Sequence, residues 1–345
     1  MRSVKAQLLV TLGAILVATG ILGVRGLPPG AEIGYYYFEE DLNGMSRCLN
    51  WGGDVDAGDN IYGETLLHYA AQNRSEEVTA FLLARGADVN ARTMDGQTPL
   101  HLALGSFGVS QKGLVLMLLA AGADLKAVDA AGNTPLHEAI WRCNYWLMAS
   151  DAARRNGTAE TDEVILAAAD ARQVIEALIE AGADVNARNS DGKTPLLMGF
   201  SLGGDYWCAP TETLVRLLHD LGADLNLADN DGNTVVHLWA SYPEEPEGGE
   251  EKVAMATCIQ LGADVNARNR EGLTPLHVAA GARFPAGLRA LIKAGANIRA
   301  QDASGWLPLH CLVFAAESDL SARGQLWDAS LPFEEPVLNG LIQSH

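Results

Sequence analysis

The stretch Gly96-Gln-Thr-Pro-Leu-His101, followed by an apolar run over 114–119 and then Gly122-Ala-Asp124, decides the fold of this chain. Thr98 is a residue type that caps helix N-termini well, and Pro99 suits the first helical position, where a backbone N–H has no partner. Gly122 stands where a helix C-terminus favours a left-handed residue. The stretch therefore predicts a short first helix (helix A), a second helix (helix B) and a turn into the next segment.

The same pattern recurs along the chain, so the helix pair is a repeat. The first six copies of the opening are each followed by an apolar helical stretch that ends in Gly-Ala-Asp or Gly-Ala-Asn. The openings are Gly63-Glu-Thr-Leu-Leu-His68, Gly96-Gln-Thr-Pro-Leu-His101, Gly132-Asn-Thr-Pro-Leu-His137, Gly192-Lys-Thr-Pro-Leu-Leu197, Gly232-Asn-Thr-Val-Val-His237, Gly272-Leu-Thr-Pro-Leu-His277 and Gly305-Trp-Leu-Pro-Leu-His310. A single repeat of this size cannot bury its apolar face, whereas stacked repeats bury a continuous core.

This pattern resembles the ankyrin repeat, whose Thr-Pro-Leu-His and Gly-Ala-Asp elements stand in nearly every copy from about residue 40 to 315. The resemblance implies an all-α solenoid of stacked helix-turn-helix units with short β-turn fingers. It also implies protein–protein binding without catalysis. The departures are that Leu66 and Val235 replace Pro, Leu197 replaces His and Leu307 replaces Thr. Each single departure should lower the stability of its repeat without changing the fold.

The predicted organisation places a hydrophobic N-terminal helix before the solenoid and a cap at each end of it. Residues 1–26 are a signal peptide or single transmembrane anchor, 27–38 a linker and 39–62 an N-terminal cap or partial repeat. The repeats are 63–95, 96–131, 132–191 (with an inserted helical extension), 192–231, 232–271, 272–304 and the partial 305–317. Residues 318–345 are a C-terminal cap or tail.

The N-terminal segment predicts export. Arg2 and Lys5 precede the uncharged run Ala6–Val24, and Arg25 closes it. A cleaved secretory signal with a small-x-small site at 18–20 is one interpretation, and an uncleaved membrane-spanning helix is the other. The second is favoured because apolar character persists beyond residue 20. With basic residues ahead of the span, the N-terminus stays in the cytoplasm. The repeat domain is then outside the cytoplasm and membrane-anchored, or secreted or periplasmic if the segment is cleaved.

Composition narrows the class of partner. The formal net charge of −19 repels phosphate backbones and anionic lipid headgroups, so nucleic acid is disfavoured and the membrane is met only through the N-terminal segment. The charge would steer a partner protein that carries a basic patch; the alternative is that it only keeps a long array soluble. We expect the chain to be monomeric. Its five cysteines include no C-x-x-C pair, which excludes a dense disulfide framework and a zinc knuckle.

The histidines do not predict a metal or catalytic site. Six of the eight hold the fourth place of the Thr-Pro-Leu-His motif, where the resemblance implies hydrogen bonds within and between repeats. Side chains one repeat apart do not converge on a metal. The sequence contains no H-E-x-x-H, G-x-S-x-G or phosphate-loop motif, so we expect no enzyme, no cofactor and no metal. An enzyme with an unrecognised site in the 142–169 insertion is the remaining alternative, with Arg154, Arg155, Asp162 and Glu163 as its only candidates.

The repeats that are longer than 33 residues indicate which segments distinguish this chain from a regular repeat array. Every added segment falls between helix A and helix B, so the insertions should line one edge. The longest, within 142–169, predicts a lengthened helix A, a turn at Asn156-Gly157 and a lengthened helix B from near Thr161. Trp146 and Trp207 lie in two of these insertions, either as interface contacts or as packing within the protrusions.

The binding surface predicted by the resemblance is the concave face formed by the fingers and helices A. Its candidate partner-binding residues are Arg92, Met94, Arg188, Ser190, Arg268 and Arg270, together with Trp146 and Trp207 in the insertions. For the finger arginines, the alternative is a solvated turn. The functional hypotheses are an exported or membrane-anchored binding module, an envelope scaffold that organises a membrane complex and, less favoured, the enzyme named above.

Overall fold

A computed structural model of the chain describes residues 42–50, 53–58, 62–105, 112–141, 144, 150, 162–203, 206–208, 211–241 and 251–314. Within these residues, no helix has both the length and the apolar character needed to cross a membrane. The predicted N-terminal helix, the turn at Asn156-Gly157, Trp146 and the tail from Ser318 lie outside the described residues.

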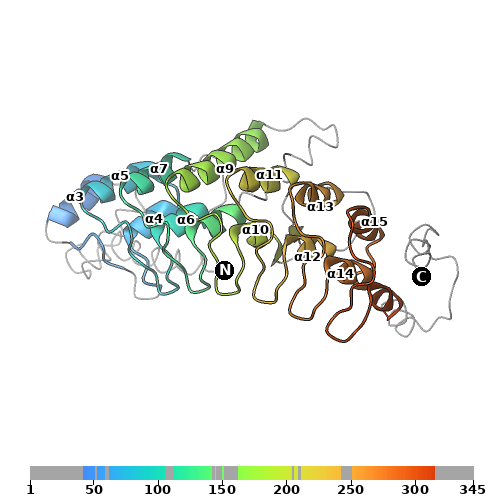
Figure 1. Cartoon of the computed structure of the whole chain (residues 1–345). Coiled ribbons are helices and arrows are strands. Elements are labelled where there is room, and N and C mark those ends of the chain that lie inside the picture. Colours follow the sequence, from blue (N-terminus) through green and yellow to red (C-terminus); the bar gives the residue numbers. More distant parts are fainter. Residues whose placement is uncertain are drawn as a thin grey trace, which may run out of the picture. The chain divides into compact units, whose positions relative to one another are not determined.

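The chain divides into two compact units, one of residues 1–139 and 169–182 and one of residues 140–168 and 183–345. The first unit contains α3 (Leu42–Asn50), α4 (Leu66–Gln72), α5 (Glu76–Ala84), α6 (Pro99–Gly105) and α7 (Lys112–Ala120) (Figure 1). The second contains α10 (Pro195–Met198), α11 (Glu212–Asp220), α12 (Val235–Ala240), α13 (Glu251–Gln260), α14 (Pro275–Gly281) and α15 (Pro285–Lys293). Helix α9 (Asp162–Glu180) contributes residues to both units, and further helical residues lie at 135–141 and 308–314.

Helices A begin as the motif predicts. Thr194 caps α10, its hydroxyl accepting a hydrogen bond from the Leu197 N–H at 3.3 Å, and Pro195 occupies the first turn. At the other end of the repeat, Gly86 and Gly262 follow α5 and α13 with φ of 86° and 97°, the left-handed region that favours glycine. Helix α9 begins at Asp162, next to the predicted start near Thr161.

Within each unit the helices of one repeat pack against those of the next. In the first unit α4 contacts α6 and α5 contacts α7. In the second, α12 contacts α14, and α11, α13 and α15 pack in sequence. Met45, Leu67 and Leu82, from three successive helices, share one core cluster and are fully buried. Burial of such side chains contributes roughly 1.5–3 kcal/mol each, so stacking is the source of each repeat's stability.

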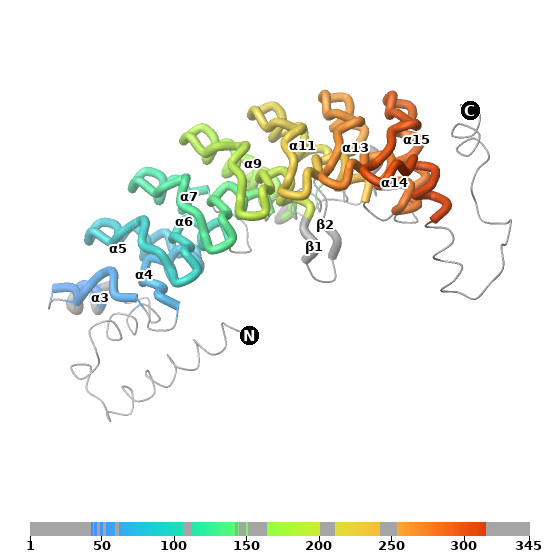
Figure 2. Tube along the Cα trace, turned by 60° about the horizontal axis from the view of Figure 1, so that its bottom comes forward, coloured from blue at the N-terminus to red at the C-terminus, as the bar shows by residue number. Residues whose placement is uncertain are grey.

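One element differs from the predicted all-helical fold. Strands β1 (Ser201–Gly203) and β2 (Tyr206–Cys208) form an antiparallel hairpin between α10 and α11, with Leu202 opposite Trp207 (Figure 2). The hairpin occupies one of the predicted insertions. Three-residue strands are too short to show the alternation of apolar and polar residues by which a strand is recognised in a sequence.

Candidate protein-binding surface

The fingers are the turns that link helix B of one repeat to helix A of the next, such as residues 91–97. Each finger is closed by main-chain hydrogen bonds: the Thr93 N–H donates to the Gln97 carbonyl at 2.9 Å, and the Gly96 N–H donates to the Thr93 carbonyl at 2.9 Å. The same pair of bonds recurs at Asn269, whose N–H donates to Leu273 at 3.0 Å. The side chains of a finger therefore project from a fixed backbone.

Neighbouring fingers are also joined to one another. In the first unit the Ala130 N–H donates to the Asp95 carbonyl at 2.8 Å. In the second unit the Asn230, Arg270 and Ala303 N–H groups donate to Asp191, Asp231 and Glu271 at 2.8, 2.8 and 3.0 Å. One such bond per step holds the fingers of a unit in a row, so a partner would meet a surface that is already ordered.

Met94 is a predicted contact whose apolar side chain is largely exposed. Its side chain is 72% exposed, while its N–H is held by the Tyr62 carbonyl at 2.8 Å. Val128, on the next finger, is 40% exposed. Large apolar side chains are therefore exposed on two adjacent, hydrogen-bonded fingers, and exposed apolar side chains of this kind can anchor a partner. We call Met94 and Val128 the finger patch.

Two of the predicted contact arginines have partners in the neighbouring finger. Arg92 donates from Nη2 to the Val128 carbonyl, and Arg268 donates from Nη1 to the Gln301 carbonyl at 2.5 Å. Arg268 also donates to Gly272, in its own finger, at 3.1 Å. These side chains are exposed, but they tie one repeat to the next. From the sequence, these arginines are expected to be partner contacts or solvated turn residues. Their hydrogen bonds to the next finger were not predicted.

The remaining predicted residues are placed as follows. Arg188 is exposed, with its guanidinium beside Gly192. Ser190 and Arg270 are exposed at their finger tips, and the Ser190 carbonyl accepts from Asn230 Nδ2 at 2.8 Å. Trp207 lies on β2. Arg188, Ser190 and Arg270 therefore lie on finger backbones, whereas Trp207 lies in the hairpin insertion.

An asparagine clamp between repeats was not anticipated from the sequence. Asn226 accepts from the Asp264 N–H at 2.7 Å and donates through Nδ2 to the Gly262 carbonyl at 3.4 Å. Asn90 makes the same two contacts with Asp124 and Gly122, at 2.7 and 3.1 Å. The signal was available, because asparagine returns two residues after the Gly-Ala-Asp aspartate in most repeats.

The motif histidines hold the repeats together, as predicted. Nδ1 of His101 accepts from the Thr98 N–H at 3.2 Å, and Nε2 lies 3.1 Å from the Asn133 carbonyl of the following repeat. Because a backbone N–H points at Nδ1, the proton is on Nε2, which donates. The same bridge is made by three other motif histidines, to the carbonyls of the next repeat. They are His68 to Gln97, His237 to Leu273 and His277 to Trp306.

Burial sets the chemistry of these groups. It lowers the pKa of His101 and of His237, against the opposing effect of their hydrogen bonds to Asn133 and Leu273. It also raises the pKa of the Cys258 thiol to about 12, so this sulfur is not a thiolate nucleophile at neutral pH. Among the described residues, no three His, Cys, Asp or Glu side chains group as a metal site would need.

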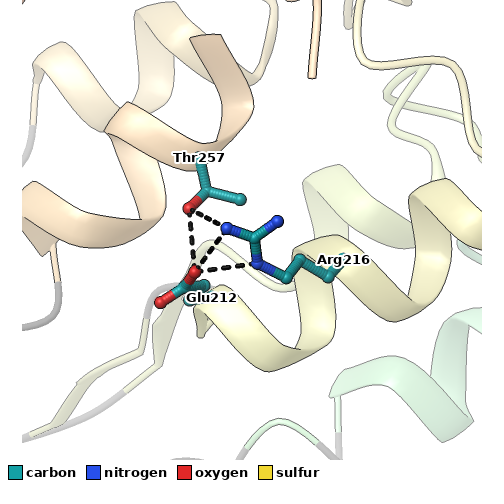
Figure 3. Close-up of polar contacts among 3 residues, drawn as sticks. All are labelled: Glu212, Arg216 and Thr257. Carbon is teal, nitrogen blue, oxygen red and sulfur yellow. Dashed lines mark hydrogen bonds and ion pairs between the residues drawn. The ribbon is translucent and has the colours of Figure 1, made fainter. Parts of the chain in front are cut away.

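Helices B carry a polar contact of their own (Figure 3). Arg216 of α11 pairs with Glu212, with Nε and Nη2 at 2.8 and 2.7 Å from Oε1, and Nη2 lies 3.4 Å from the Thr257 hydroxyl of α13. The Thr257 hydroxyl in turn donates to Glu212 Oε1 at 3.2 Å. Thr257 is only 2% exposed, so its hydroxyl depends on these partners.

Two parts of this chain match known repeat families, and the chain has relatives among known repeat proteins. Residues 42–129 match the family described as ankyrin repeats (3 copies), and residues 259–311 match the one described as ankyrin repeats (many copies). The chain is 34% identical over 98 residues to ankyrin repeat and SOCS box protein 5 of Mus musculus, covering 28% of this chain and 29% of that protein. It is 38% identical over 65 residues to the nuclear factor NF-kappa-B p105 subunit of Gallus gallus, covering 19% of this chain and 7% of that protein. The chain thus spans less than a third of either relative.

A solved structure gives the same fold. The ankyrin repeat domain of Bcl-3, described as a unique member of the IkappaB protein family, matches 74% of this chain and 99% of its own, with a TM-score of 0.52 and 22% identity. Ankyrin repeats form an all-helical solenoid that is typically a non-catalytic scaffold for binding other proteins. The motif, the helix pairs with their fingers and these matches together show that the chain is an ankyrin repeat protein.

Proposed function

We propose that this chain binds a partner protein through the face formed by its fingers and helices A, with the finger patch as an anchor. The observation that carries the proposal is the 72% exposure of Met94 on a finger whose backbone is tied to both neighbours, through Tyr62 and through Asp95 and Ala130. Because the finger backbone is already ordered, binding at Met94 loses side-chain but little backbone conformational entropy.

The finger arginines have a supporting part in this proposal. Because Arg92 reaches the Val128 carbonyl, it fixes the two fingers that carry the patch, and its exposed edge remains available to a partner. Arg188, Ser190 and Arg270 are the proposed finger contacts of the second unit. The Trp146 and Trp207 insertions are proposed as a second contact region.

The test compares two exposed apolar residues of the first unit. A photo-reactive phenylalanine analogue is placed at Met94 in one variant and at Leu116 in the other. Leu116 is 43% exposed on helix B α7, which is not part of the proposed face. We expect cross-linking of one protein species at position 94 and not at 116. Met94→Asp should weaken binding of that species at least tenfold, whereas Leu116→Asp should leave it unchanged. Equal cross-linking at both positions, or only at 116, would exclude the finger patch.

We also propose that binding takes place outside the cytoplasm, on an exported or membrane-anchored protein. The support is the apolar run Ala6–Val24 between Arg2, Lys5 and Arg25. A partner with a basic patch would be steered by the chain's negative charge, and its association rate should then fall as salt is raised. A scaffold for a membrane complex is the alternative role. Several different proteins cross-linked along the face, instead of one species, would favour it.

A further inference from the structure

The last described repeat exposes three large apolar side chains. Trp306, Val313 and Phe314 are 40%, 51% and 58% exposed, and the rings of Trp306 and Phe314 meet edge to face at 5.6 Å. Their helical stretch, 308–314, is the helix A of that repeat. Among the described residues, no helix B follows it.

Comparison with other repeats shows that one of these positions is normally covered and that another is normally not apolar. Val313 lies three residues after the motif histidine, where Ala71, Ala240 and Ala280 are fully buried. Phe314 takes a position at which Gln72, Ser241 and Gly281 are exposed, so here a polar or small residue is replaced by an aromatic one. A large apolar side chain at an otherwise solvent-exposed position indicates a missing contact.

The motif histidine of this repeat points to the same conclusion. Nδ1 of His310 accepts from the Leu307 N–H at 2.9 Å, as in the other repeats. In His237 and His277, Nε2 then donates to a main-chain carbonyl of the next segment, Leu273 or Trp306. Among the described residues no carbonyl takes that place for His310. What covers this face is therefore expected to bring a backbone carbonyl, as a polypeptide segment does.

The chain itself carries a segment with the pattern of a helix B. In α15, Leu288-Arg-Ala-Leu291-Ile292 follows Pro285, and both leucines are fully buried. Downstream, Leu338-Asn-Gly-Leu341-Ile342 follows Pro336, with the same leucine spacing. Proline suits the first helical position, and residues three or four apart share one helical face. Leu338 and Leu341 thus correspond to the two buried leucines of α15.

We propose that residues 336–343 form the helix B of the last repeat and pack on helix 308–314 and α15, covering Trp306, Val313 and Phe314. Leu288 lies 13 positions after Pro275, whereas Leu338 lies 30 positions after Pro308, so this repeat contains a 17-residue insertion between its two helices. The array already has a longer one, in the repeat that opens at Gly132 and spans 60 residues. Trp141, at the position equivalent to Phe314, precedes that insertion and is also aromatic.

Hydrogen exchange of the full-length chain, read by mass spectrometry, tests the proposal. We expect amides of 308–314 and 336–343 to be protected to the same degree at low and high protein concentration. Leu341→Asp should raise exchange of both segments at least tenfold and leave α14 unchanged. Asn339→Asp is the matched control, because Asn339 corresponds to the exposed Arg289 of α15, and it should have no effect.

Three outcomes would overturn the proposal. The first is unprotected exchange of 336–343 in the unaltered chain. The second is protection of 308–314 that appears only at high concentration, which would assign the face to a second copy. The third is equal effects of Leu341→Asp and Asn339→Asp. If Leu341→Asp also unfolds α14, Leu341→Ala replaces it, and its effect should remain confined to 308–314 and 336–343.

Discussion

At the scale of single residues, the motif histidine has the clearest role, because one imidazole serves two repeats. In His101→Ala, the Thr98 N–H and the Asn133 carbonyl lose a buried partner. Leaving a buried polar group unpaired costs about 1–3 kcal/mol. We therefore expect the free energy of urea unfolding to fall by about 2–4 kcal/mol. His219→Ala is the control, since the His219 side chain is 37% exposed, and it should have little effect. Equal losses in the two variants would contradict the structural role of His101.

The same histidines predict how stability depends on pH. Burial lowers the pKa of His101 and His237 in the folded chain below the ordinary value of 6.5. Between that value and the folded pKa the unfolded chain binds more protons, so acid favours unfolding. Stability should be constant with respect to these groups above pH 6.5 and decrease as pH falls below it. Urea unfolding at pH 7.5, 6.5 and 5.5 measures the slope, and His101→Gln should reduce it. A stability that rises as the pH falls from 6.5 to 5.5, with no change of slope in the variant, would refute the assignment.

Single residues also show the limit of prediction from sequence. The histidine bridges could be predicted because motif and resemblance agreed. The bond from Arg92 to the Val128 carbonyl could not, since it depends on which neighbouring carbonyl the finger geometry brings within reach. Met94 was a candidate because finger residues differ between repeats, but its 72% exposure is a property of the folded finger.

At the scale of helices, capping, stacking and the positions of the insertions were predictable, but the strands within one insertion were not. Thr194 and Pro195 start α10 as their chemistry predicts, and the glycines end helices B in the left-handed region. The β1–β2 hairpin was not predicted, because backbone pairing of so few residues leaves no periodicity. Thr257 reads as an ordinary helix residue until its packing against α11 is known.

The contact between α11 and α13 gives a prediction about a buried hydroxyl. Glu212→Ala removes the acceptor of the Thr257 hydroxyl and should lower the free energy of unfolding by about 1–3 kcal/mol. Glu212→Gln keeps an oxygen acceptor and should cost less. Adding Thr257→Val to Glu212→Ala removes the unpaired hydroxyl and should recover part of the loss. Chemical denaturation of the three variants and the unaltered chain measures the losses and the recovery. No recovery in the double variant would mean that the hydroxyl does not depend on Glu212.

At the scale of the whole molecule, part of the acidity has a local structural cause. The Gly-Ala-Asp aspartates are exposed, yet each accepts the N–H two residues on, as Asp88 does from Asn90 and Asp264 from Asn266, both at 2.8 Å. One turn-forming carboxylate in most repeats makes the net charge more negative, and this needs no partner protein as its explanation. The charge of −19 therefore supports solubility and turn formation as well as steering. A salt-dependent association rate would show the steering contribution separately.

The last prediction concerns where the repeat array resides. A reporter that is active only outside the cytoplasm, fused after His345, should be active with the full chain and inactive when residues 1–26 are deleted, because Ala6–Val24 supplies the apolar run that export needs. The deleted form should keep the helical circular dichroism of the repeats, since their cores are made within the stacked helices. Replacing Val10 and Leu16 by a pair of arginines interrupts the run while keeping its length, and it should abolish reporter activity as deletion does. Reporter activity that survives both changes would place the export information elsewhere, and loss of helicity on deletion would make the segment part of the folded core.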